Sequence, residues 1–121
     1  MNLPSFLTEE LYLRLLTNGR ASLEAADVQA NFDPLPVVKL FTPDGGATWL
    51  LTELDPDEPD HAFGLCDLGM GCPELGYVSL TELQTVRGRL GLPVERDLHF
   101  QADRPLSEYT RLAQAEGRIV A

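Results

Sequence analysis

The longest stretch of the chain without a basic residue lies between Lys39 and Arg87. It contains no lysine or arginine, although it carries nine aspartates and glutamates. The whole chain has a net charge of −10. Because nucleic-acid binding and attachment to anionic membranes both depend on Lys and Arg, this charge balance argues against either role. Basic proteins and metal cations are the partners that it favours.

The chain also lacks a long apolar run and is poor in cysteine. No segment reaches the ~20 apolar residues that a membrane helix needs. Residues Met1 to Pro4 include no basic side chain, and Glu9 and Glu10 interrupt any apolar core of a signal peptide. With only Cys66 and Cys72 present, we expect a cytoplasmic protein in a reducing compartment, with both thiols free.

What the chain does contain is typical of a folded protein. It has 121 residues, of which 44% are hydrophobic and 23% are charged. A chain of this length buries roughly 65% of the surface that its unfolded form exposes, which is enough for a core without disulfides. We therefore expect one domain over residues 1–121.

An apolar hairpin stands at the centre of the expected fold. Val37–Thr42 and Ala47–Leu54 are predicted to be strands, and Pro43–Gly46 is predicted to be the turn between them. The two strands are apolar on both faces, which is typical of central strands that are covered on each side. Within such a strand, Trp49 is expected to be a core residue.

Capping signals and apolar periodicity predict the helices. The first begins after Thr8 and ends at Asn18–Gly19, where glycine supplies a left-handed stop. A short helix follows over Ser22–Ala30. The Ser79–Glu82 segment is a capping box that opens a helix ending at Gly91. The apolar residues of that helix are expected to face inward: Leu80, Leu83, Val86 and Leu90.

Three more strands complete the expected sheet. Two of them are Ala62–Cys66 and Gly76–Val78, and Val94–Gln101 is expected to contain a fifth strand centred on Leu98–Phe100. A last helix begins at Pro105 or Ser107, ends at Glu116 and is stopped by Gly117. The expected fold class is α+β, with a small, mostly antiparallel sheet of four to five strands. Helices from the N-terminus, middle and C-terminus are expected to pack on it.

The acidic, proline-punctuated loop Asp55–His61 is the first candidate site. A solvated, rigid turn is favoured over a calcium loop, because Pro56 and Pro59 interrupt the spacing and no closing glutamate follows. The loop is expected to share an acidic face with the Pro43–Gly46 turn. The binding residues expected on this surface are Asp44, Glu53, Asp55, Asp57, Glu58, Asp60, Asp67 and Glu74.

Cysteine and histidine chemistry provides the alternative interpretations. Cys66 and Cys72 are six positions apart and His61 and His99 are distant, which does not match the spacing of a zinc site. A Cys-His hydrolase would use Cys72 with either histidine, but a catalytic thiol needs an electropositive setting. The residues of a metal-dependent alternative would be Asp57, Asp60, His61 and Asp67. We therefore expect no catalytic residue, cofactor or bound metal.

Several segments of the chain resemble one family. They are PVVKLFTPDG, TWLLTELDP, FGLCDLG, GCPELGYVSL and RGRLGLPVERDLHF. These segments are similar to those of small bacterial proteins known only as a domain of unknown function. The resemblance covers nearly the whole chain and is strongest from Pro34 to Pro105. It implies an accessory protein of plasmids, integrative elements and phages, encoded near DNA-processing or anti-restriction genes, and it implies no catalytic residue.

Binding without catalysis is the function that these observations favour. Carboxylates held on a rigid hairpin can occupy a groove that normally holds a phosphate backbone. Together with the context implied by the resemblance, this predicts a nucleic-acid mimic that inhibits a host restriction or CRISPR system by binding a protein with a basic surface. The alternatives are the metal-dependent or Cys-His hydrolase and an obligate partner of a protein encoded by a neighbouring gene. Direct contact with nucleic acid or membrane is not expected.

Overall fold

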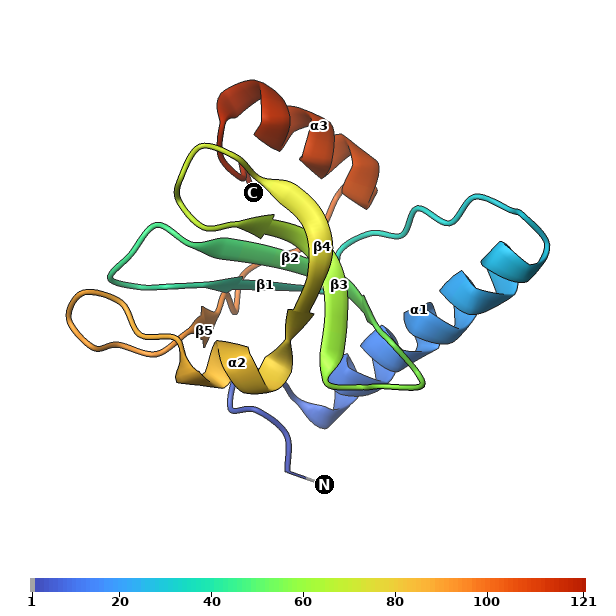
Figure 1. Cartoon of the computed structure of the whole chain (residues 1–121), viewed down its shortest axis with the longest axis horizontal. Coiled ribbons are helices and arrows are strands. Elements are labelled where there is room, and N and C mark those ends of the chain that lie inside the picture. The colour runs from blue at the N-terminus through green and yellow to red at the C-terminus, as the bar shows by residue number, and fades with distance from the viewer. Residues whose placement is uncertain (1) are drawn as a thin grey trace.

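The computed structural model describes residues 2–121 as an open antiparallel sheet with helices on both faces (Figure 1). The helices are α1 (Glu9–Asp27), α2 (Leu80–Thr85) and α3 (Leu106–Glu116). The strands are β1 (Val38–Phe41), β2 (Thr48–Leu54), β3 (His61–Asp67), β4 (Glu74–Ser79) and β5 (Glu95–Arg96). Their order across the five-stranded sheet is β4-β3-β2-β1-β5. The α+β class predicted from the sequence is confirmed.

The strands from β1 to β4 form where the sequence predicts them. The apolar hairpin appears as β1 and β2, which pair with Val38 opposite Leu51 and Phe41 opposite Thr48. β3 and β4 confirm the two strands expected after the acidic loop, and each is longer than predicted. β2 lies in the middle of the sheet, between β3 and β1.

The core has two parts, one on each face of the sheet. On one face, α1 and α2 cover a cluster that includes Leu40 and Trp49. On the other face, α3 covers a cluster that includes Leu50 and Leu65. Trp49 is 2% exposed and Leu50 is fully buried. β2 is therefore apolar on both faces because helices cover both, as the sequence predicts.

Helix α1 begins as predicted but is longer than predicted. The hydroxyl of Thr8 accepts a hydrogen bond from the backbone N–H of Leu11 at 3.2 Å, which confirms the cap. The predicted stop at Asn18–Gly19 and the separate helix over Ser22–Ala30 are wrong, because α1 continues to Asp27.

Gly19 serves close packing of α1 on the sheet. It is buried against β2, where a Cβ at this position would overlap the carbonyl oxygen of Leu54. Beside it, the side-chain amide of Asn18 donates to the carbonyl oxygen of Thr52 at 2.8 Å. The Asn-Gly pair therefore fixes a helix–strand contact, and the local preference of glycine for turns does not decide its conformation.

The capping box that opens α2 is confirmed, but the helix is short. The hydroxyl of Ser79 accepts from the backbone N–H of Glu82 at 3.2 Å. The predicted continuation to Gly91 is wrong, because α2 ends at Thr85. Leu90, which was expected to face inward, is 81% exposed.

A carboxylate from the β1–β2 turn holds the loop that replaces the rest of this helix. Asp44 Oδ2 accepts hydrogen bonds from the backbone N–H groups of Leu90 and Leu92. The chain then enters β5, which pairs with β1. A strand within Val94–Gln101 is thus confirmed, but it is two residues long and lies before the expected centre at Leu98–Phe100.

The last helix is confirmed. α3 begins after Pro105 and ends at Glu116, and the next residue, Gly117, has a left-handed φ of 74°. Among residues 2–121, no helix combines the length and the apolar character that crossing a membrane requires.

Candidate acidic interaction surface

The predicted acidic residues lie at two opposite ends of the sheet. Consecutive turns of antiparallel strands alternate between the two ends. Asp44 lies in the β1–β2 turn, and the register of β2 on β3 places Asp67 and Glu74 at the same end. The Asp55–His61 loop joins β2 to β3 at the other end, about 20 Å away along the strands. The acidic loop and the Pro43–Gly46 turn therefore lie at opposite ends of the strands.

Asp60 holds the start of α2. Its carboxylate accepts from the hydroxyl of Ser79 at 2.6 Å and from the backbone N–H and hydroxyl of Thr81 at 2.9 and 2.7 Å. These hydrogen bonds, led by that of Ser79, lower the pKa of Asp60 below its ordinary value. The acidic loop thus places a fixed negative charge beside the end of β4.

Asp67 and Asp44 bind backbone groups rather than forming an open surface. Asp67 is 3% exposed, and its two oxygens accept from the N–H of Gly69 at 2.8 Å and of Ile119 at 3.0 Å. Asp44 holds the loop after α2, as described above. Both carboxylates therefore stabilise the fold, and neither adds much exposed negative charge.

The Asp55–His61 loop carries exposed charge in a defined conformation. Asp55 Oδ1 accepts from the backbone N–H of Asp57 at 2.9 Å. Glu58 Oε2 lies 2.9 Å from Nδ1 of His61. Asp57 and Glu58 are both exposed. These contacts hold the loop in one conformation, and the carboxylates of Asp57 and Glu58 remain exposed to a partner.

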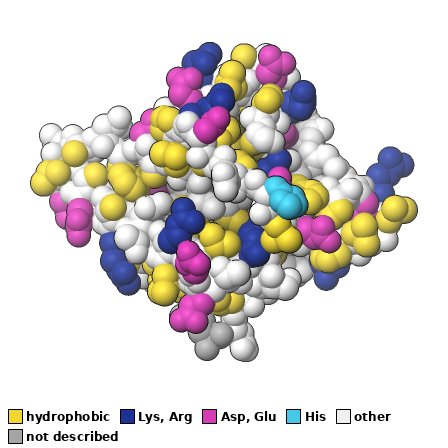
Figure 2. Space-filling view, turned by 180° about the vertical axis from the view of Figure 1, so that it is seen from behind, with side chains coloured by type: hydrophobic (Ala, Val, Ile, Leu, Met, Phe, Trp, Pro, Cys, Tyr) yellow, Lys and Arg dark blue, Asp and Glu magenta, His cyan; other side chains and the backbone are white. Residues whose placement is uncertain are grey.

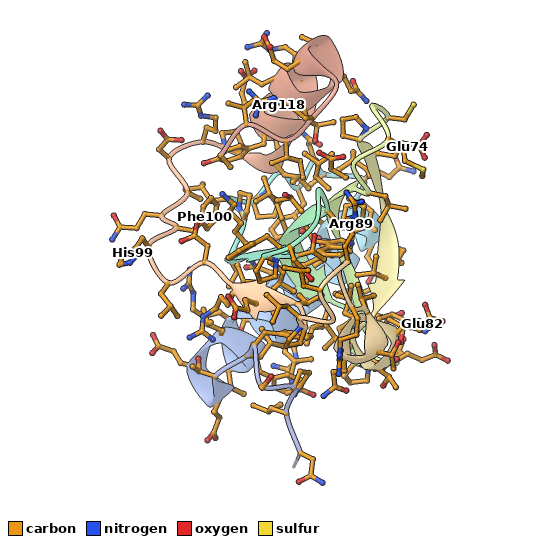
Figure 3. All side chains as sticks on the ribbon, turned by 90° about the vertical axis from the view of Figure 1, so that its left-hand side faces the viewer. Glu74, Glu82, Arg89, His99, Phe100 and Arg118 are labelled. Carbon is orange, nitrogen blue, oxygen red and sulfur yellow. The ribbon has the colours of Figure 1, made fainter. Side chains whose placement is uncertain are left out.

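Exposed acids also flank strand β4. Glu74 begins this strand and Glu82 lies in α2, which follows it, and both project from the same side of the molecule (Figure 3). The sequence reasoning missed Glu82 as a surface residue because the capping box accounted for it. Figure 2 shows the side away from β4, where basic and acidic side chains are interspersed.

Glu53 is one of the predicted binding acids, but its side chain is buried in the fold. It lies at a β-bulge, where the register of β2 on β3 shifts between Leu51 and Glu53, and it is 8% exposed. The hydroxyl of Thr52 lies 3.4 Å from its Oε1, and Ser22 of α1 supplies a second hydroxyl. Burial raises the pKa of Glu53 above its ordinary value, although the two hydroxyls partly oppose this shift.

Glu53, Phe63 and Tyr77 form a row across β2, β3 and β4. The ring centroids of Phe63 and Tyr77 are 5.1 Å apart, and Tyr77 is 62% exposed. Partial burial raises the pKa of Tyr77, and the negative charges of Glu53 and Asp55 raise it further. Tyr77 thus presents an exposed aromatic ring on a sheet edge where the nearby charges are negative, an arrangement that attracts a cationic side chain.

The raised pKa of Glu53 predicts how stability depends on pH. A pKa above the ordinary value of 4.5 means that the folded protein binds more protons than the unfolded chain. The contribution of Glu53 to stability is therefore fully present below pH 4.5 and is lost as the pH rises through the folded-state pKa. We expect Glu53→Gln to unfold at higher urea concentration than the wild type at pH 7, and at a similar concentration near pH 4.

The control for this experiment is Glu24→Gln, which neutralises an exposed acid of α1. Its urea midpoint should follow that of the wild type at both pH values. A Glu53→Gln protein that loses stability relative to the wild type on going from pH 4 to pH 7 would contradict the assignment.

The structure does not bring the residues of the enzyme alternatives together. Among residues 2–121, no three His, Cys, Asp or Glu side chains are placed to hold a metal ion. Burial raises the pKa of the Cys66 thiol to about 11, so this thiol is protonated at neutral pH. In Figure 3, His99 projects from the side opposite Glu74, away from the β3–β4 loop that carries Cys72.

Two grooves that the sequence reasoning missed lie away from the acidic loop. One, of about 480 Å³, lies between α1 and the segment that precedes β1, and includes Leu13 and Leu35. The other, of about 520 Å³, lies beside α3. In the second groove, the guanidinium of Arg104 lies 5.4 Å from the ring centroid of Tyr109 and pairs with Asp103 at 2.8 Å. The charges of Arg104 and Asp103 in this groove thus offset each other, while Asp97, which also lines it, pairs with Lys39.

A family model described as "Protein of unknown function (DUF2958)" matches residues 6–120 of the chain. The match spans every helix and strand described above. No curated protein and no solved structure matches the chain.

Proposed function

The chain belongs to the family described as "Protein of unknown function (DUF2958)", and from this premise we propose that it is a non-enzymatic protein that binds a basic partner protein. The binding surface would be the acidic half of the molecule, which we define as β2, β3, β4, α2 and the loops between them. The acidic half spans residues 48–85 and holds no lysine or arginine.

The observation that carries this proposal is that the elements of the acidic half are neighbours in space. β2, β3 and β4 are neighbours in the sheet, and α2 follows β4 directly. A segment without basic residues therefore forms three adjacent strands, up to the β4 edge of the sheet, and the helix that follows them. The exposed carboxylates on it are Asp57, Glu58, Asp60, Glu74 and Glu82. Because most of them stand on strands, helices or a hydrogen-bonded loop, little ordering entropy is lost when a partner binds.

A more specific form of the proposal is inhibition of a host DNA-targeting defence. Fixed carboxylates attract the same Lys and Arg side chains that hold a phosphate backbone, so the acidic half would compete with DNA for a basic groove. The resemblance of the sequence motifs to small proteins of mobile DNA supports this form. It would make the chain an accessory protein of a plasmid, integrative element or phage, acting on a restriction or CRISPR protein.

Capture from a bacterial lysate at low and high salt tests the proposal. We expect the immobilised protein to retain basic proteins at about 50 mM salt and to release them near 0.5 M, because screening weakens contacts between exposed charges. A variant in which four acids of the acidic half are neutralised should retain much less. Its substitutions are Asp57→Asn, Glu58→Gln, Glu74→Gln and Glu82→Gln.

The matched control neutralises four exposed acids outside the acidic half, so that both variants have the same net charge. Its substitutions are Glu24→Gln, Asp27→Asn, Glu95→Gln and Glu116→Gln. Equal retention by the two variants, or no salt-sensitive partner of the wild type, would overturn the proposal. The more specific proposal is tested by measuring how well a plasmid or phage survives restriction or CRISPR. The wild type should protect it, and the variant with four neutralised acids in the acidic half should not.

A further inference from the structure

The outer edge of β4 has no strand partner among residues 2–121. β4 lies at the end of the strand order, and within the described part of the chain it pairs with β3 alone. The opposite edge is formed by β5, which is two residues long, whereas β4 has six. A six-residue free edge is long enough to bind an extended peptide through its backbone.

The register identifies which backbone groups face outward. The backbone N–H of Leu80 donates to the carbonyl oxygen of Asp60 at 2.8 Å, and these two residues are opposite each other if the β3–β4 register is continued. In antiparallel pairs, hydrogen-bonded and non-hydrogen-bonded positions alternate. Val78, Gly76 and Glu74 therefore bond to β3. The N–H and C=O groups of Leu75 and Tyr77 point away from β3, toward the free edge.

This edge lacks the features that usually protect an edge strand. Lysine, proline or a covering segment commonly prevents pairing with another chain. Glu74–Ser79 contains no lysine or proline, and its only charged residue is Glu74. Leu75 is 48% exposed and Tyr77 is 62% exposed. Exposed apolar and aromatic side chains therefore stand on the same two residues whose backbone groups are free.

The charge around the edge selects the kind of partner. Glu74 lies at the start of β4, and Asp60 lies beside its end, where the Asp60 carboxylate binds Ser79. A second copy of this chain, which also has a net charge of −10, would bring another acidic β4 edge against this one. Like charges at close range oppose such pairing, whereas Lys and Arg side chains would be attracted.

We propose that β4 is a docking strand, which takes an extended segment rich in lysine or arginine from the partner protein and so adds a sixth strand to the sheet. This inference rests on the proposed function and names the docking element. The backbone groups of Leu75 and Tyr77 would supply the hydrogen bonds. A guanidinium over the ring of Tyr77 and a cation beside Glu74 would supply the preference for a basic segment.

Synthetic peptides of about ten residues test this docking mode with the wild-type protein. The first peptide alternates arginine with valine, and the second alternates glutamate with valine. Two further peptides repeat the first, with N-methyl groups on either all arginines or all valines. Because alternate N–H groups of a strand face opposite sides, only one N-methylated peptide should lose binding. Binding is measured by calorimetry, and protection of the Leu75 and Tyr77 amides by hydrogen exchange.

Two variants of β4 provide a second measurement. Leu75→Pro removes an outward-facing N–H without removing a bond to β3, a position where an edge strand tolerates proline. We expect it to bind the Arg-Val peptide about tenfold more weakly, since one backbone hydrogen bond to the peptide is lost. Leu75→Thr keeps the N–H and should bind within about threefold of the wild type. Circular dichroism is used to check that both variants are folded.

Each outcome separates this inference from the proposed function. Loss of binding with one N-methylated peptide, together with protection of the two amides, supports the docking strand. If both N-methylated peptides bind as well as the parent, the docking strand is overturned while a salt-sensitive basic partner still supports the proposed function. If the free protein is a dimer that Leu75→Pro makes monomeric, the edge belongs to a second copy and the inference is overturned.

Discussion

Replacing Gly19 with alanine is expected to destabilise the protein by about 2 kcal/mol, although alanine is the better helix former. A Cβ at Gly19 would overlap the carbonyl oxygen of Leu54 and lie 3.1 Å from its carbonyl carbon. Backbone atoms of a central strand cannot move aside as a flexible side chain can. Overpacking of this kind costs about 3 kcal/mol, which exceeds the ~1 kcal/mol gained from helix propensity.

The measurement is the free energy of unfolding in urea, with Gly76→Ala as the matched control. A Cβ at Gly76 would have no atom within 4 Å, so that variant should be at least as stable as the wild type. If Gly19→Ala is as stable as Gly76→Ala, the close contact between α1 and β2 is not present in solution.

The second large effect is expected at Asp67. Asp67→Ala would remove the acceptor of two backbone N–H groups, those of Gly69 and Ile119. Ile119 belongs to the core beneath α3, so its N–H would be left without a partner in a buried place. Such a loss costs about 3 kcal/mol, because hydrogen bonds to a charged acceptor are among the stronger ones. Urea unfolding measures the loss, and hydrogen exchange at Ile119 should become faster.

Asp57→Ala is the control for this experiment, because Asp57 is exposed. It should change the free energy of unfolding by less than about 0.5 kcal/mol. If the two substitutions have the same small effect, Asp67 does not hold the C-terminal segment. If the effect is large, alanine at Asp67 would weaken any binding by unfolding the protein, so Asp67 should be left intact in tests of the acidic half.

The predicted acids thus divide into two groups that the sequence does not separate. Asp57 and Glu74 are exposed and available to a partner, whereas Asp67 is buried and binds backbone. Asp60 belongs to both groups, because it is exposed and also holds the start of α2. A carboxylate looks the same in sequence whether its oxygens face water or a distant N–H. Ile119, for example, is 52 positions from the aspartate that binds it.

Local signals predicted the starts of elements better than their ends. The caps at Thr8 and Ser79 formed as expected, because an N-cap hydrogen bond joins residues three positions apart. The predicted C-terminal ends of α1 and α2 were wrong. In the sequence, Gly19 looks like the end of a helix, because its close contact with β2 is not visible there. The loop after Thr85 is held by Asp44, which accepts a hydrogen bond from the N–H of Leu90, 46 positions later in the chain.

The sequence by itself determined the α+β class, the central apolar hairpin, the starts of the helices and the absence of basic residues from 40 to 86. These features depend on composition and on neighbours within a few positions. Only the tertiary structure decided where α1 and α2 end, which acids are exposed, and that β4 is a free edge. Those features depend on strand order and on hydrogen bonds between residues far apart in the chain, which no local pattern specifies.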